Sequence, residues 1–217
     1  RGSDLRLDLE IEFEEAVFGT AKDIEIDHLE SCTRCSGSGV EPGSQPVTCP
    51  TCAGLGQIQR TTQTILGHFT QVSTCPDCHG TGKKILNPCK ECSGKGRVTK
   101  SKVINIKIPK GIDDGTKMRV SGEGDAGKNG GPSGDLYVVI YVKPHKYFKR
   151  EGVNILFETQ ISFAQAALGD TIEVPTVDGT EPLKIQAGTQ SGTILTIKGA
   201  GVPYINNPSR RGDQFVK

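Results

Sequence analysis

The sequence predicts a mainly β fold, in which two similar small β domains stand in tandem and an elongated cysteine-rich insertion with β-hairpin character interrupts the first. Three observations support this prediction. Apolar residues alternate with polar ones on both sides of a central region, that region holds all eight cysteines, and two later stretches match each other without gaps. A chain of 217 residues with 28 glycines and 5% aromatic residues has material for one to two domains with many turns.

Alternating apolar residues predict the strands of the first β domain. In D-L-R-L-D-L-E-I-E-F, every second residue from Leu5 to Phe13 is apolar, which is the period of a half-buried strand. A short helical turn is expected in E-E-A-V-F-G. Ile24 and Ile26 then share one face of a second strand, and the alternation resumes after the cysteines at Ile104. Because such strands bracket the cysteine-rich region, that region is expected to be an insertion.

The eight cysteines form four C-x-x-C pairs with the same short tail. The unit C-x-x-C-x-G-x-G occurs as CTRCSGSG, CPTCAGLG, CPDCHGTG and CKECSGKG, and these units are called knuckles one to four below. A thioredoxin-like enzyme needs one pair at a strand-to-helix junction, and four glycine-flanked copies do not fit that need. Structural Zn²⁺ takes four thiolates in a tetrahedron, so four knuckles predict two Zn²⁺ per chain. The glycines allow backbone N–H groups to turn toward the sulfurs.

Two pairings of the knuckles are open. Between Cys52 and Cys75, two polar stretches rich in β-branched residues flank I-L-G-H and predict a hairpin, which returns the chain to its start. This favours nested pairing, knuckle one with four and two with three. The predicted ligands are Cys32, Cys35, Cys89 and Cys92 for the first zinc, and Cys49, Cys52, Cys75 and Cys78 for the second. The sequential alternative joins knuckle one to knuckle two, whose 13-residue separation is also typical of zinc sites.

A self-similarity predicts the second β domain. The stretch from Ile108 (I-P-K-G-I-D-D-G-T-K-M-R-V-S-G-E-G) aligns with the stretch from Ile185 (I-Q-A-G-T-Q-S-G-T-I-L-T-I-K-G-A-G), and G-D-L-Y-V later matches G-D-Q-F-V. Such matches in register indicate a duplicated domain. The second copy stops at Lys217 where the first continues, so we expect its last strand to be incomplete. The expected domains are the first β domain at 1–29 and 98–144, the cysteine-rich domain at 30–97, and the truncated second β domain at 145–217.

Composition and motifs argue against several other functions. A net charge of +1 offers no broad electrostatic footprint for nucleic acid, and the basic run from Lys95 to Lys102 is expected to be a solvated strand approach. No apolar run or signal pattern indicates a membrane partner, so a cytoplasmic protein is expected. No nucleophile–base arrangement stands out, and we predict no catalytic residues and no enzyme activity. His79, next to Cys78, is expected to be a solvated spacer.

With four such knuckles inserted into the first of two duplicated β domains, the chain resembles the C-terminal portion of type I DnaJ co-chaperones, a class of J-domain proteins. The likeness covers essentially the whole chain and includes RGSDLRLDLEIEFEEAVFG, GEGDAG, PHKYFKREG and FAQAALGD. None of the four histidines stands in a His-Pro-Asp motif, so the J domain is expected to be absent. The lead-in E-I-D-H-L-E-S-C resembles bacterial or plastid members, which implies the bacterial cytosol or an organelle stroma.

The resemblance implies a binding protein that captures unfolded or partly folded polypeptides, called clients below, and delivers them to a DnaK-type chaperone. A client segment is expected to add as a strand to the edge of the first β domain, with an apolar side chain in a pocket. The residues carried over for this site are Leu5, Ile24, Ile26, Ile104 and Val138. The resemblance also implies a homodimer for the full-length protein and a monomer for this fragment. Two alternatives are a thiol–disulfide exchange catalyst and a zinc-ribbon binder of nucleic acid.

Overall fold

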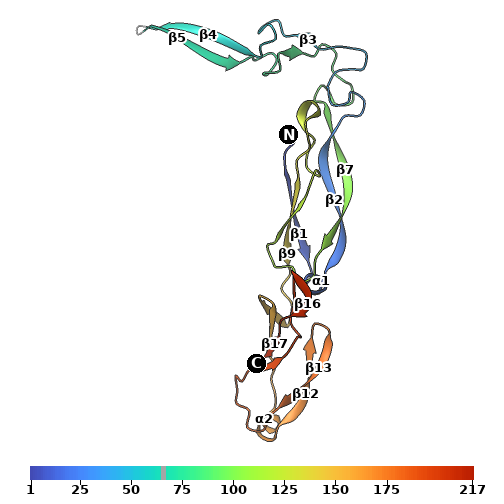
Figure 1. Cartoon of the computed structure of the whole chain (residues 1–217), viewed down its shortest axis with the longest axis vertical. Coiled ribbons are helices and arrows are strands. Elements are labelled where there is room, and N and C mark those ends of the chain that lie inside the picture. The colour runs from blue at the N-terminus through green and yellow to red at the C-terminus, as the bar shows by residue number, and fades with distance from the viewer. Residues whose placement is uncertain (65–66) are drawn as a thin grey trace. The chain divides into compact units, whose positions relative to one another are not determined.

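The computed structural model describes residues 1–64 and 67–217, and it confirms a mainly β fold (Figure 1). Its contacts divide the chain into two compact units. The first comprises Arg1–Leu5, Asp27–Lys102 and Ser121–Leu136, and the second comprises Arg6–Ile26, Val103–Val120 and Tyr137–Lys217. The domain bounds expected from the sequence stay a prediction. None of the helices in the described ranges is both long and apolar enough to cross a membrane.

Short strands make up most of the chain. The helical elements are α1 (Phe13–Phe18), the 3₁₀ helix η1 (Lys128–Gly130) and α2 (Phe163–Leu168). The strands are β1 (Leu5–Ile11), β2 (Thr20–Ser31), β3 (Val47–Thr48), β4 (Gln57–Thr64), β5 (Gly67–Thr74), β6 (Lys83–Lys84), β7 (Arg97–Ile108), β8 (Lys117–Val120), β9 (Leu136–Val142), β10 (Phe148–Glu151), β11 (Asn154–Phe157), β12 (Asp170–Thr176), β13 (Gly179–Ile185), β14 (Leu195–Ile197), β15 (Pro203–Tyr204), β16 (Asn207–Arg211) and β17 (Gln214–Val216).

The alternating apolar residues near the start of the chain form β1, but this strand ends at Ile11, earlier than predicted. Its burial alternates along Leu5–Ile11, and it pairs with β9, which in turn pairs with β8. Phe13 is not part of the strand, because it is the first residue of α1. The Glu15 carboxylate accepts a hydrogen bond from the Glu12 N–H at 2.8 Å, which stabilises this helix start. Phe13 is therefore turned into the core, where it is only 4% exposed.

β2 and β7 form a two-stranded sheet of long strands, which Figure 1 shows side by side in blue and green. Asn105 of β7 donates to the Asp23 carboxylate of β2 at 2.6 Å, and Ser101 donates to Asp27. From the first contact to the second, the residue number increases by four on β2 and decreases by four on β7. The two strands therefore run antiparallel, with no bulge between these contacts. The inward side chains of this sheet include Ile24, Ile26 and Ile104, as the sequence predicts.

The internal duplication is visible in matching hydrogen bonds. Asp135 accepts from the Gly122 N–H at 2.9 Å in the first copy, and Asp213 accepts from the Gly199 N–H at 2.8 Å in the second. The sheet order β1-β9-β8 of the first copy recurs as β11-β17-β14, with β10 added beside β11. Two similar β domains in tandem are therefore confirmed.

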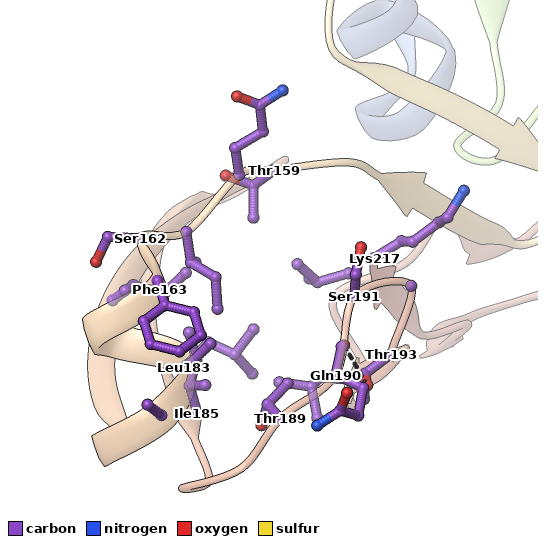
Figure 2. A pocket seen from close by; sticks show the side chains of 18 of the residues that line it. Thr159, Ser162, Phe163, Leu183, Ile185, Thr189, Gln190, Ser191, Thr193 and Lys217 are labelled. Carbon is purple, nitrogen blue, oxygen red and sulfur yellow. Dashed lines mark hydrogen bonds between the residues drawn. The ribbon is translucent and has the colours of Figure 1, made fainter.

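The two copies differ in what covers their short helix. In α1, Phe13 contacts the rings of His145 and Phe148, with centroid distances of 5.3 and 6.1 Å. In α2, the matching Phe163 is 89% exposed and no residue of the helix is buried. Phe163 lies beside an open cavity of about 720 Å³, across from the loop at 188–193 (Figure 2). The second copy thus presents an open groove, lined by both apolar and polar residues, where aromatic rings cover the short helix of the first copy.

Candidate metal centres and peptide-binding edge

The hairpin predicted between knuckles two and three is present. β4 and β5 pair antiparallel from Gln57 opposite Thr74 to Thr64 opposite Gly67, and the predicted turn residues Ile65 and Leu66 lie outside the described residues. The hairpin returns the chain from knuckle two to knuckle three. β2 ends just before knuckle one and β7 begins just after knuckle four, so the β2–β7 sheet joins the outer knuckles.

Paired knuckles are bound to each other by reciprocal backbone hydrogen bonds. In the outer pair, the Cys32 N–H donates to the Gly96 carbonyl at 3.0 Å, and the Cys89 N–H donates to the Gly39 carbonyl at 2.9 Å. The inner pair repeats the arrangement with 2.9 Å bonds from Cys49 to Gly82 and from Cys75 to Gly56. Each pair is therefore a closed, nearly twofold unit built by the backbone.

The cysteine side chains meet in two groups of four, in the nested arrangement. Within each group all sulfurs lie within 4.8 Å of one another, and all eight cysteines are buried and free of disulfides. The Sγ–Sγ distances across the pairs are 3.9 Å for Cys32–Cys89, 3.7 Å for Cys35–Cys92, 3.9 Å for Cys49–Cys75 and 3.6 Å for Cys52–Cys78.

These distances distinguish metal binding from disulfide formation. A disulfide holds its sulfurs at about 2.05 Å. A tetrahedron with Zn–S bonds of about 2.3 Å spaces its sulfurs about 3.8 Å apart, close to the spacing found in both groups. The donor set of four thiols, each buried, therefore fits a structural Zn²⁺ in either group.

Backbone N–H groups and burial set the acidity of the thiols. Burial raises the pKa of Cys32 to about 12 and that of Cys52 to about 11. Burial acts on Cys35 in the same direction, but the Gly39 N–H donates to its sulfur at 3.3 Å and neighbouring thiols add to this, so its pKa falls to about 7. Burial also acts to raise the pKa of Cys78, but donation from Gly82 and Gly80 and contacts with the Cys52 and Cys75 thiols together lower it to about 7. Each group thus holds one thiol that ionises near neutrality.

The glycines also allow the knuckles to approach closely. The second glycine of each knuckle lies against the carbonyl oxygen of the first glycine in the partner knuckle. A Cβ atom on Gly39 would meet the Gly94 oxygen at 2.4 Å, and one on Gly56 would meet the Gly80 oxygen at 2.5 Å. The sequence predicts that these glycines let each knuckle fold back on its sulfurs, but it does not predict this contact between two knuckles.

The five residues expected to bind a client occupy different places. Ile24 and Ile26 of β2 and Ile104 of β7 share one sheet, and Val138 belongs to β9. Ile24 is 6% exposed and Val138 is fully buried, so these side chains are as enclosed as core residues. Leu5, in the other compact unit, is half-buried. Their role in binding a client stays a prediction.

At Leu29, the outer edge of β2 is covered by the segment that holds Asp125 and Ala126. There the Leu29 N–H donates to the Asp125 carboxylate at 2.9 Å, and the Leu29 carbonyl accepts from the Ala126 N–H at 2.6 Å. In an antiparallel pair alternate residues bond to the same neighbour. The Cys32 N–H donates to Gly96, which directly precedes β7. The even-numbered residues of β2 therefore direct their backbone N–H and C=O groups toward β7, and the odd-numbered residues direct theirs to the outer edge. The sequence did not indicate that Asp125 closes this edge.

Comparison with known proteins agrees with this architecture. The family model of the DnaJ C terminal domain matches residues 5–217. The chain is 52% identical over 217 residues to "Chaperone protein DnaJ" of Acetivibrio thermocellus, and 55% identical over 216 residues to the protein of that name from Thermosynechococcus vestitus. In both comparisons it is covered completely and spans 56% and 58% of the relative. The chain belongs to the DnaJ C-terminal domain family.

Proposed function

We propose that this chain binds unfolded or partly folded polypeptides and serves in their delivery to a DnaK-type chaperone in the cytosol. The client segment adds as a strand to the outer edge of β2, and two structural Zn²⁺ ions, one in each cysteine group, hold the inserted finger together. The chaperone names of the relatives support the general role. The chain spans less than three-fifths of the length of those relatives.

The observation that carries the proposal is the open edge of β2. Among the described residues, β2 pairs with β7 alone, so its outward N–H and C=O groups have no strand partner from residue 21 to residue 27. Unpaired edges of this length template the addition of another strand. Just beyond this open part, the outward N–H and C=O groups of Leu29 already form hydrogen bonds with Asp125 and Ala126, as they would with a neighbouring strand. Main-chain bonds would give an affinity that tolerates many client sequences.

Side chains on the two faces of the edge differ in chemistry. The buried face presents Ile24 and Ile26, and the exposed face presents three carboxylates, Asp23, Glu25 and Asp27. An added strand would place alternate side chains beside each face, because successive residues of a strand point to opposite sides. Alternating apolar and polar residues therefore suit the edge, with apolar side chains near the isoleucines.

A proline substitution tests the proposal. Glu25→Pro removes one outward N–H and places a ring at the open edge. The hydrogen bonds to β7 come from the even-numbered residues on either side, so they are kept, and proline is tolerated at such edge positions. We expect the affinity for a reduced, unfolded model client to fall about tenfold, as loss of a hydrogen bond and close contact implies. Glu25→Thr is the matched control, because it removes the carboxylate but keeps the N–H. Unchanged affinity in a folded Glu25→Pro protein would refute strand addition at this edge.

Thiol–disulfide exchange is a second candidate, favoured by the pKa of about 7 at Cys35 and Cys78. Burial of all eight cysteines opposes it, because a thiolate must reach a disulfide to attack it. Metal content separates the two functions. About two Zn²⁺ per chain with slow thiol reaction supports the structural role, whereas a metal-free chain that reduces insulin supports exchange.

A further inference from the structure

Each knuckle carries one exposed spacer side chain directly before its second cysteine, and these four side chains differ. They are Arg34, Thr51, Asp77 and Glu91 in knuckles one to four. In the inner pair, the Thr51 hydroxyl donates to the Asp77 carboxylate of the facing knuckle. The two knuckles of the inner pair thus bring their spacer side chains together.

The outer pair is linked by charge. Arg34 donates to the Glu41 carboxylate, whose other oxygen accepts from the Lys90 N–H of knuckle four at 3.1 Å. Glu41 therefore links Arg34 of knuckle one to the backbone of knuckle four.

The sequential pairing would lose these links and create a repulsion. Knuckles one and two would bring Arg34 to Thr51, and knuckles three and four would bring Asp77 to Glu91. Two carboxylates would then face each other beside a Cys₄ metal centre that is itself negative. Glu41 would also lose the Lys90 N–H, because knuckle four would no longer stand beside knuckle one.

We propose that the spacer side chains, together with Glu41, specify which knuckles share a metal ion. The β2–β7 sheet and the β4–β5 hairpin bring the nested partners near each other, and the spacer side chains disfavour the sequential alternative while the eight thiols acquire metal. The inference rests on metal binding by both cysteine groups, as proposed above.

The test refolds the whole chain from a reduced, metal-free, denatured state in the presence of ¹¹³Cd²⁺. Proton–cadmium correlations then assign each cysteine to an ion. The variant Thr51→Glu with Glu91→Arg reverses the code: nested pairing would join Arg34 to a second arginine, and sequential pairing would join opposite charges. Thr180→Glu with Glu181→Arg makes the same charge changes on exposed positions of β13 and is the control.

In the control we expect nested correlations. In the reversed variant, the ratio of nested to sequential species should fall at least tenfold, roughly what several reversed ion pairs of modest strength give. Asp77→Asn with Glu91→Gln, a milder variant that removes both carboxylate charges, should also yield sequential species. If both variants show only the correlations of nested pairing, whether one or two Cd²⁺ ions are bound, the proposal is wrong. Absence of any cysteine–cadmium correlation in the unchanged protein would contradict metal binding itself, and this inference with it.

Discussion

Gly82 lies directly against Gly54 of the facing knuckle, so closely that a Cβ atom on Gly82 would be 2.2 Å from the Gly54 carbonyl oxygen. The contact joins the backbones of knuckles two and three beside their four sulfurs. Because the obstructing atom belongs to the backbone, it cannot move aside as a flexible side chain could. The inner metal centre therefore depends on glycine at this position for space as well as for conformation.

Replacing Gly82 by alanine should weaken the inner centre selectively. Gly43→Ala is the matched control, since Gly43 also has a positive φ of 88° but has no atom within 4 Å of an added Cβ. The control should cost about 1–2 kcal/mol of left-handed strain. Gly82→Ala should lower zinc affinity at one of two sites at least tenfold further, measured by chelator competition. Equal affinities in the two variants would show that the close approach is unimportant.

Replacing His79 by glycine should leave both metals bound. His79 has φ of 47°, in the left-handed region that costs a residue with a side chain about 1 kcal/mol or more. Glycine removes this strain, so the finger should become slightly more resistant to chelator, whereas His79→Val should make it less resistant. Zinc is counted by elemental analysis. Loss of one Zn²⁺ from the glycine variant would instead identify His79 as a ligand.

Metal affinity should rise with pH. Free thiols below their pKa hold protons that metal binding must displace. Cys32, with a pKa of about 12, gives up a full proton at neutrality, whereas Cys35, with a pKa of about 7, is already about half ionised. Affinity per site should therefore fall by about 10³–10⁴ from pH 7 to pH 6, and less steeply above pH 7. Chelator competition at each pH measures the slope, and a flat profile would contradict thiol coordination.

The carboxylates on the exposed face of β2 should bias client choice by charge. Extended peptides with leucine alternating with lysine should bind more tightly than those with leucine alternating with glutamate, because the outer side chains lie beside Asp23, Glu25 and Asp27. The difference should be about tenfold at low salt and shrink as salt screens exposed charges. The triple variant Asp23→Asn, Glu25→Gln, Asp27→Asn should lose the preference but still bind both. If the triple variant still prefers the lysine-containing peptides, these three carboxylates are not the cause of the preference.

Local patterns in the sequence were enough for the repeated elements. Period-two alternation located β1, β2 and β7, and the repeated knuckle identified two groups of four cysteines. Both signals are local, because a strand face or a turn is written in neighbouring residues. The same locality explains the error at Phe13: its alternation continues that of β1, but the bond between Glu12 and Glu15 starts a helix first.

Contacts between distant residues were not predictable in the same way. Asp125 closes the β2 edge from 96 residues beyond Leu29, and Glu41 reaches Lys90 across 49 residues. Nothing in the neighbouring sequence marks these carboxylates, since an exposed acidic residue in a loop is ordinarily solvated. The uncovered face of α2 was also not predicted, because α2 begins with phenylalanine and has alanine at its fourth position, as α1 does, while its surroundings differ.

Amide hydrogen exchange along β2 tests the central claim most directly. The even-numbered amides already face β7, whereas those of Asp23, Glu25 and Asp27 face the open edge. On addition of a saturating unfolded client, we expect these three outward amides to slow markedly while those of Ile24 and Ile26 change little. Protection spread evenly over odd and even positions, or none at all on β2, would contradict addition of the client as a strand.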